Sequence, residues 1–237
     1  MLKRTALIAV TLLVTTGAAS STEFGISGLN MGMNPDQIEQ AALKISPEWK
    51  WSGFNKWSIA SGEEYVANGR WKNADPMTRS MDTIDFVFSG IGSGNGLIAL
   101  KREILFGDDM SKVPSGKTVA ESLFAKFGEP SLRDQQGESY HLVWRFDEAG
   151  KITKTENWGN CQHMPDAAGL KIDPSCGLFV VASISSDSVG YAGRLNLLMI
   201  DHTRAAESQP LDEKYAEESV TAKKAKVLSN SVKAPAL

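Results

Sequence analysis

The sequence has few of the residues that build most catalytic and metal centres. Its 237 residues include two cysteines and three histidines. His141, His163 and His202 lie in unrelated surroundings, and none accompanies a serine in a Gly-x-Ser-x-Gly nucleophile elbow. Paired acids such as Asp108-Asp109 are explained as solvated loop charges. We therefore favour a protein that is not an enzyme and uses no cofactor or metal, with an exported hydrolase built from scattered Asp, Glu and His as the alternative.

Long hydrophobic runs are also lacking, except near the start of the chain. Lys3 and Arg4 precede an uncharged run over residues 5–14, and small residues follow as far as Ala19. This order is the signature of a secretory signal peptide. The run is shorter than the roughly 20 residues of a membrane-spanning helix. We predict a signal peptide over residues 1–19, with cleavage after Ser20 or an uncleaved anchor as alternatives, and a protein without a lipid anchor that is periplasmic or secreted.

Neither sign of charge dominates. The chain has 25 Lys and Arg against 28 Asp and Glu, a formal net charge of −3. Loss of residues 1–19 removes two cations and no acid, which gives −3 − 2 = −5. A mildly acidic chain is a poor candidate for binding nucleic acid or anionic membrane surfaces. We expect its partner to be another envelope or secreted protein.

The two cysteines, Cys161 and Cys176, predict a disulfide. An even number of cysteines in an exported chain indicates pairing. Closing a loop of this length stabilises a protein by about 3 kcal/mol in the chain-entropy model. The alternative is a metal site formed by Cys161, His163 and Cys176. That site lacks a fourth ligand and the Cys-x-x-Cys spacing that is typical of structural zinc.

Local capping signals predict helices. Asn34 and Gln37 suit the two ends of a capping box, and Pro47 ends the helix that they begin. Thr118 and Glu121 predict a second capping box, in a helix that closes at Gly128 and Pro130. Acids at the start and bases at the end favour a third helix over residues 211–228. Its apolar stripe is thin, so we expect loose docking and a disordered end over residues 230–237.

Alternating apolar and polar residues predict three β-hairpins. The first follows an aromatic-rich connection over residues 49–71, and its tip is the glycine-rich segment 90–96. The paired segments are 78–89 with 97–106, 140–146 with 151–158, and 178–184 with 194–201.

Together these elements predict an α+β fold of two helix-plus-antiparallel-hairpin units after the signal peptide. The first unit covers residues 24–110. The second covers residues 111–205 and contains the disulfide loop, and residues 206–237 form the C-terminal helix and tail. The two units could share one continuous sheet.

Two short motifs resemble those of known exported proteins. The segment 26–38, with Gly28, Gly32-Met33-Asn34 and Gln37-Ile38, is similar to the helix-opening motif of SmpA/OmlA-type proteins and of the tandem repeats in β-lactamase inhibitory protein. The segment 127–131, Phe-Gly-Glu-Pro-Ser, resembles the second landmark of those families. The resemblance implies helices packed on an antiparallel sheet and a function in binding other proteins. The closest likeness is to uncharacterised exported proteins with such repeats.

Two glycine-containing segments depart from nucleotide-binding motifs. Ser115-Gly116-Lys117-Thr118 would need glycine at position 111 to form a phosphate-binding loop, and Ser111 stands there. The segment 90–96 has Asn95 where a dinucleotide loop needs its third glycine. We interpret the first segment as a helix cap. The second is a mobile hairpin tip, which could contact a partner through Gly94 and Asn95.

The remaining feature is an aromatic group formed by Trp49, Trp51, Phe54 and Trp57. Exposed tryptophans in a loop can anchor a protein partner or stack on a sugar. Burial over the sheet is the favoured explanation. Our candidate partner-binding residues are Trp49, Trp51, Trp57, Gly94 and Asn95.

Overall fold

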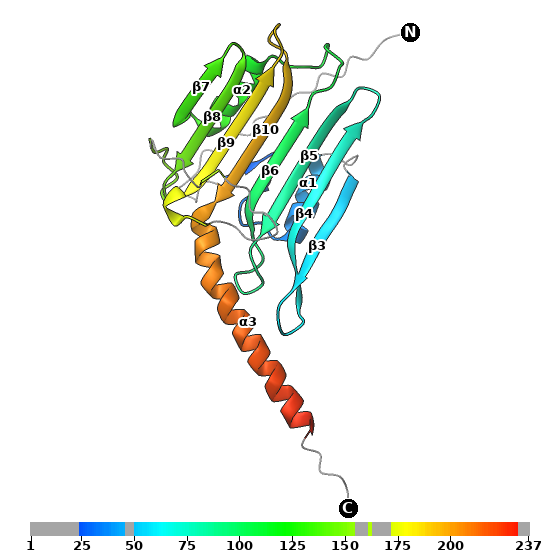
Figure 1. Cartoon of the computed structure of the whole chain (residues 1–237), viewed down its shortest axis with the longest axis vertical. Helices are drawn as coiled ribbons and strands as arrows, with labels where there is room; N and C mark the ends of the chain where they lie inside the picture. Colours follow the sequence, from blue (N-terminus) through cyan, green and yellow to red (C-terminus); the bar gives the residue numbers. More distant parts are fainter. Residues whose placement is uncertain (1–23, 46–49, 155–160, 163–171, 232–237) are drawn as a thin grey trace, which may run out of the picture.

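One antiparallel sheet organises the molecule. The computed structural model describes residues 24–45, 50–154, 161–162 and 172–231. The eight strands of the sheet run in the order β3-β4-β5-β6-β10-β9-β8-β7. Each half of the sheet is therefore a four-stranded meander, and the last strands of the two meanders, β6 and β10, meet at the centre (Figure 1). The strands are β3 (Lys50–Ser58), β4 (Glu64–Asp75), β5 (Ser80–Phe88), β6 (Leu97–Leu105), β7 (Leu132–Gln136), β8 (Ser139–Phe146), β9 (Leu178–Ser186) and β10 (Ala192–Asp201).

Two helices cover one face of this sheet. Helix α1 (Pro35–Ile45) precedes the first meander and α2 (Gly116–Phe127) precedes the second, and both lie behind the sheet in Figure 1. Ile38 of α1 and Leu123 of α2 belong to one core with strand residues such as Leu100 and Met199. Full burial of such a side chain contributes about 1.5–3 kcal/mol. A small hairpin of β1 (Gly25–Ile26) and β2 (Leu29–Asn30) adds Ile26 and Leu29 to the same core.

The caps of α1 and α2 follow from the residues before them. Asn34 and Gln37 exchange two hydrogen bonds of 2.9 Å between backbone N–H and side-chain oxygen, which confirms the first capping box. The second one is wrong. The cap of α2 is Ser115, whose hydroxyl accepts from the Thr118 N–H at 3.0 Å, so the helix begins one turn earlier than predicted. Gly128 ends α2 with a φ of 79°, as expected of a glycine cap.

Two predicted hairpins are confirmed, those of β5 with β6 and of β9 with β10. The prediction that residues 49–71 form a connection is wrong, because most of this segment belongs to the antiparallel strands β3 and β4. The register of this pair shifts between Trp51 and Gly53 and again between Asn55 and Lys56. Each shift breaks the two-residue alternation by which a strand is recognised in a sequence.

The predicted pairing of residues 140–146 with 151–158 is also wrong. Strand β8 pairs instead with β7 and β9, and the returning chain keeps one bridge, Phe146 with Ile152. The turn between them is present, since the Asp147 N–H donates to the Lys151 carbonyl at 3.0 Å. Residues 155–158 lie outside the described residues.

Helix α3 (His202–Ser231) is longer than predicted and follows β10 directly. The Asp201 carboxylate accepts from the Arg204 N–H at 2.9 Å, as an N-cap does, and the helix continues through Pro210. From β10 the helix extends beyond the sheet (Figure 1). Within the described part of the chain, no helix is apolar enough over a sufficient length to cross a membrane.

Candidate functional site

The sheet face opposite α1 and α2 carries polar and charged side chains across its width. Neighbouring residues on a strand point to opposite faces, and cross-strand partners share a face. Because Ile84, Leu142 and Leu197 pack in the core, the residues next to them face away from the helices. The strand register places these residues in one row: Lys72, Thr83, Glu103, Asn196, Ser183, His141 and Asp134.

A second row beside it is charged on the central strands. It contains Arg70, Asp85 and Lys101 as successive cross-strand neighbours. Arg70 forms an ion pair with Asp85, and the hydrogen bond from its guanidinium to this carboxylate raises the pKa of Arg70 above its ordinary value. The carboxylate of Glu103, which the register places on the same face, acts in the same direction. Glu103 also pairs with Arg194 at 3.4 Å.

This face is cationic on an acidic chain. The name "central charged face" is used below for the outward residues of β4, β5, β6 and β10. It has four cations and two acids, a net charge of 4 − 2 = +2, whereas the whole chain carries −3. Its charged residues are Arg70, Lys72, Lys101 and Arg194 with Asp85 and Glu103.

His141 and Ser183 meet on the row, at the second half of the sheet. Nδ1 of His141 lies 3.2 Å from the Ser183 hydroxyl. A histidine beside a serine is one part of a hydrolytic site. Acyl transfer also needs donors for an oxyanion, and the backbone N–H groups of β8 and β9 around this pair are engaged in the sheet ladders on both sides. The geometry supports a polar surface contact.

The disulfide lies on the same face, near the start of β9. Cys161 and Cys176 are bonded, which confirms the pairing predicted from the sequence. Their side chains form a small buried cluster with Val143, Phe179 and Val181, which point away from the main core. The cysteines therefore cover the start of β9 and the neighbouring part of β8.

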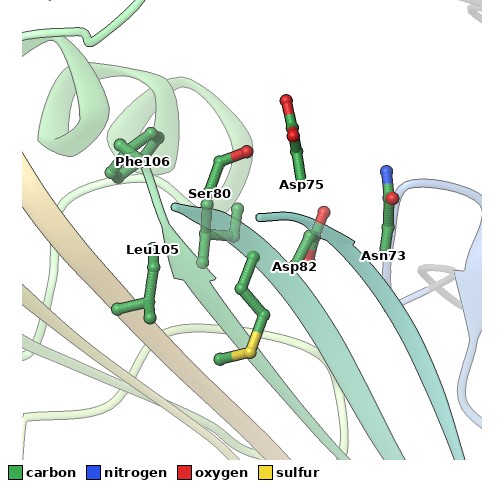
Figure 2. A pocket seen from close by; sticks show the side chains of 8 residues that line it. Asn73, Asp75, Ser80, Asp82, Leu105 and Phe106 are labelled. Carbon is green, nitrogen blue, oxygen red and sulfur yellow. The ribbon is translucent and has the colours of Figure 1, made fainter. Parts of the chain in front are cut away.

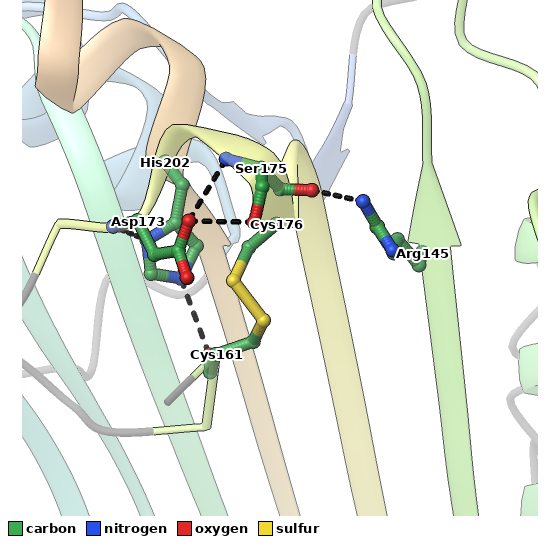
Figure 3. Close-up of a disulfide and its surroundings, with 6 residues drawn as sticks. All are labelled: Arg145, Cys161, Asp173, Ser175, Cys176 and His202. Carbon is green, nitrogen blue, oxygen red and sulfur yellow. Dashed lines mark hydrogen bonds between the residues drawn. A yellow bond between two sulfur atoms is a disulfide. The ribbon is translucent and has the colours of Figure 1, made fainter. Parts of the chain in front are cut away.

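His202, the first residue of α3, joins both arms of the disulfide loop (Figure 3). Its Nε2 lies 3.2 Å from the Cys161 carbonyl, and its Nδ1 lies 3.3 Å from the Asp173 N–H. Because a backbone N–H only donates, Nδ1 accepts and Nε2–H donates. Burial lowers the pKa of His202 below its ordinary value, while the Cys161 carbonyl and the carboxylates of Asp173 and Asp201 act in the opposite direction. A neutral imidazole thus holds the loop to α3.

The alternative metal site is not supported by this geometry. Cys161 and Cys176 are consumed by their disulfide, so neither offers a thiolate to a metal. The third proposed ligand, His163, lies outside the described residues. Across the ranges that the structure describes, no three acidic, histidine or cysteine side chains gather as a metal site would need.

The glycine-rich turn 90–96 does not stand free. Asn95, with a φ of 52°, donates from its side chain to the carbonyls of Val66 and Ser89, both at 2.7 Å. Gly94, with a φ of 91°, has open space around its Cα. Of these two candidate partner-binding residues, Asn95 is engaged within the molecule and Gly94 faces open space. The turn also contacts α3 through Asp212, a contact that no sequence motif predicted.

The aromatic group is divided by the structure. Trp57 is 42% exposed at the end of β3, opposite Tyr65 of β4. Phe54 packs against Phe88 with ring centroids 6.0 Å apart. Trp51 lies in strand β3, and Trp49 lies outside the described residues. Of the tryptophans named as partner-binding candidates, Trp57 is therefore the one shown on the surface.

A small hollow lies where β4 and β6 end and β5 begins (Figure 2). Its volume is about 180 Å³, below the 300–1,000 Å³ of typical small-molecule sites. Asp82 there is already held by Arg102 through two hydrogen bonds of 3.0 and 2.6 Å. Asp75 accepts from the Met77 N–H and the Thr78 hydroxyl, which lowers its pKa. Both carboxylates are thus engaged within the protein.

The fold and this face define an α+β protein with one antiparallel sheet, two helices on one side and a charged surface on the other. Comparison with protein-family models, with curated proteins and with solved structures finds no match to the chain. The resemblance to SmpA/OmlA-type and inhibitory repeat proteins therefore stays a prediction.

Proposed function

We propose that this chain is an exported, non-enzymatic protein-binding module whose central charged face binds an acidic surface of another envelope or secreted protein. The net charge of +2 on that face, within a chain of net charge −3, is the observation that carries the proposal. Charge complementarity of this kind steers a partner and fixes its register on the surface. Arg70, Lys72 and Arg194 are exposed there, so they are accessible to it.

The beginning of the sequence and the disulfide support export. Residues 1–19 have the charged start, apolar middle and small-residue end of a signal peptide. The bond between Cys161 and Cys176 is stable in an oxidising compartment and is rare in a reducing one. We infer that the protein works in the periplasm or outside the cell.

The order of elements supports a module built from two related units. A helix followed by a four-stranded meander occurs twice, as α1 with β3–β6 and as α2 with β7–β10. In the proposed repeat, the two meanders join through β6 and β10, so their outward faces form one surface. The predicted resemblance to exported repeat proteins that bind other proteins points to the same function.

Site-specific photo-crosslinking tests the proposal. A photoreactive residue replaces Asn196 on the central charged face or, as control, Lys117, which is exposed on α2 behind the sheet. Both variants are produced in the native host and recovered from the periplasmic and culture fractions. We expect a reproducible adduct with one acidic protein from position 196 and none from position 117. N-terminal sequencing of the same material should begin at Ser20.

Charge reversal then measures the contribution of the face to affinity. Lys101→Glu should weaken binding of the crosslinked partner by about tenfold or more, and Lys117→Glu should leave it unchanged. Added salt should weaken binding to the unmodified protein. An adduct from position 117 alone, no adduct from either position, or equal affinities of both charge-reversal variants would contradict the proposal.

A further inference from the structure

The turn between β5 and β6 holds a carboxylate from α3. The backbone N–H groups of Gly90 and Ser93 donate to the two oxygens of Asp212 at 2.7 and 2.8 Å. The Ser93 hydroxyl lies 3.1 Å from the same carboxylate. These contacts join residues that are 122 and 119 positions apart in the sequence. The two N–H groups stand three residues apart and converge on one anion, as in the concave backbone sites that bind carboxylates and phosphates, and this arrangement is called the nest below.

The turn is built around this carboxylate. A Cβ on Gly90 would lie 2.5 Å from Cγ of Asp212, closer than side-chain contacts occur in proteins. Ser89 is buried, and its hydroxyl accepts from the Gly96 N–H at 3.0 Å and lies 2.8 Å from the Ser93 hydroxyl. Ser89 thereby fixes both Ser93 and the base of the turn. The donors are thus held in place for an anion by the loop itself.

In the described parts of the chain, no lysine or arginine forms an ion pair with Asp212. The dipoles of the Gly90 and Ser93 N–H groups and of the Ser93 hydroxyl therefore bind its charge. Beyond Asp212, α3 is fastened by exposed contacts: the Tyr215 hydroxyl donates to Glu63 at 2.9 Å, and the Lys223 ammonium donates to the Ser61 carbonyl at 2.7 Å. The nest is therefore the most buried anchor of α3 after its first two turns.

We propose that the turn 90–93 is a carboxylate-binding site, that Asp212 is its built-in ligand, and that a free carboxylate occupies it when Asp212 is removed. The ligand class follows from the donors, which are two backbone N–H groups and one hydroxyl spaced for the two oxygens of a single carboxylate. The site does not depend on the partner-binding proposal, since its donors and its ligand belong to the turn 90–93 and to α3, outside the central charged face, and its test needs the protein alone.

Amide hydrogen exchange of Asp212→Ala tests the first half of this proposal. Loss of the carboxylate leaves the N–H groups of Gly90 and Ser93 without their acceptor, so their exchange should become at least about tenfold faster. The matched control is Glu213→Ala. It removes the same charge at the next position of α3, where the Glu213 side chain is exposed and accepts a hydrogen bond from Gln209. This control should leave both amides unchanged.

Chemical rescue tests the second half. Sodium acetate, added to Asp212→Ala against sodium chloride at equal ionic strength, should slow exchange at Gly90 and Ser93 and raise the melting temperature. The double variant Asp212→Ala, Ser93→Ala should respond more weakly, because one donor is missing. If Asp212→Ala does not fold, Asp212→Asn serves instead, since its amide oxygen accepts one bond and its NH₂ faces the other donor, which should accelerate one amide more than the other.

Three outcomes would overturn the proposal. They are unchanged exchange at Gly90 and Ser93 in both Asp212 variants, equal acceleration in Glu213→Ala, and a response to acetate that does not exceed the response to chloride.

Discussion

Two segments that connect strands both hold α3, and they do so by different chemistry. The disulfide segment holds the first residue of α3 through His202, which bridges the two arms of a covalently closed loop. The glycine-rich turn holds the helix ten residues later, through backbone N–H groups on Asp212. The first anchor depends on a covalent bond and on the protonation of one ring. The second depends on close backbone approach and on one charge.

The two anchors place different requirements on the residues that hold α3. The first anchor is closed by the covalent bond between Cys161 and Cys176. The turn has no such bond, so its fit requires glycine where α3 approaches. A Cβ on Gly92 would lie 2.6 Å from Cβ of Tyr215. The two anchors should therefore fail under different perturbations.

Removal of the disulfide should have the largest effect. The double variant Cys161→Ala, Cys176→Ala should lose about 3 kcal/mol of unfolding free energy in urea, the amount expected for a loop of this length. Dithiothreitol should have a similar effect on the unmodified protein and none on the double variant. In hydrogen exchange, the first turn of α3 should become less protected and the turn 90–96 should not. Equal loss of protection in both would show that the two anchors act as one.

Crowding of the glycine-rich turn should have the next largest effect. Gly92→Ala should cost about 1–3 kcal/mol, because the added methyl meets the backbone of α3 at Leu211 as well as Tyr215. Gly193→Ala is the matched control. Its added methyl would make one ordinary contact, 3.7 Å from the Ser185 carbonyl, so its stability should change by about 1 kcal/mol or less. Urea unfolding of both variants measures the difference, and similar midpoints would contradict the close fit.

The smallest of these effects should come from acidification, which lowers the free energy of unfolding through His202 in the first anchor. Because burial lowers the pKa of His202, the unfolded chain takes up this proton first as the pH falls. The contribution of neutral His202 to the free energy of unfolding is fully present above about pH 6.5. It is lost as the pH falls toward the lower pKa that His202 has in the folded state. The slope for one proton is at most about 1.4 kcal/mol per pH unit.

His202→Gln separates this effect from other groups. Glutamine can still donate to the Cys161 carbonyl but does not titrate, so stability measured between pH 5 and pH 7 should become flatter than in the unmodified protein. The carboxylates of Asp75, Asp109 and Asp173 have lowered pKa values, and their contributions are lost only below about pH 4. An identical slope in the variant would assign the pH dependence to another group.

Features that depend on near neighbours in the chain could be predicted from the sequence. The Asn34–Gln37 capping box spans three residues, and the Gly128 cap lies at the end of its own helix. The disulfide could be predicted because the chain has only one possible pair of cysteines. The two hairpins that were confirmed keep long stretches of regular alternation between short turns.

The rest depended on distant contacts or on broken patterns. Strand β3 was missed because two register shifts interrupt its alternation, and the second hairpin was wrong because β7 and β9 take the two ladder sides of β8. The central charged face had a signal in the polar residues of each strand, but a row forms only when β6 and β10 are neighbours. The thin apolar stripe of α3 predicted loose docking, in agreement with the 51% and 60% exposure of Leu211 and Val227, but it did not indicate the polar contacts that hold the helix.

The sequence by itself determined the Asn34–Gln37 capping box, the Gly128 cap, the cysteine pairing and the α+β character of this protein, because each is set by a few residues whose stereochemistry or number favours one outcome. The tertiary structure decided that two meanders join at β6 and β10, that a glycine-rich turn receives Asp212, and that α3 begins at His202. The Asp212 contacts join residues 122 and 119 positions apart, and the β6–β10 pairing spans α2 and strands β7 to β9, so no short segment of the sequence carries a signal for either.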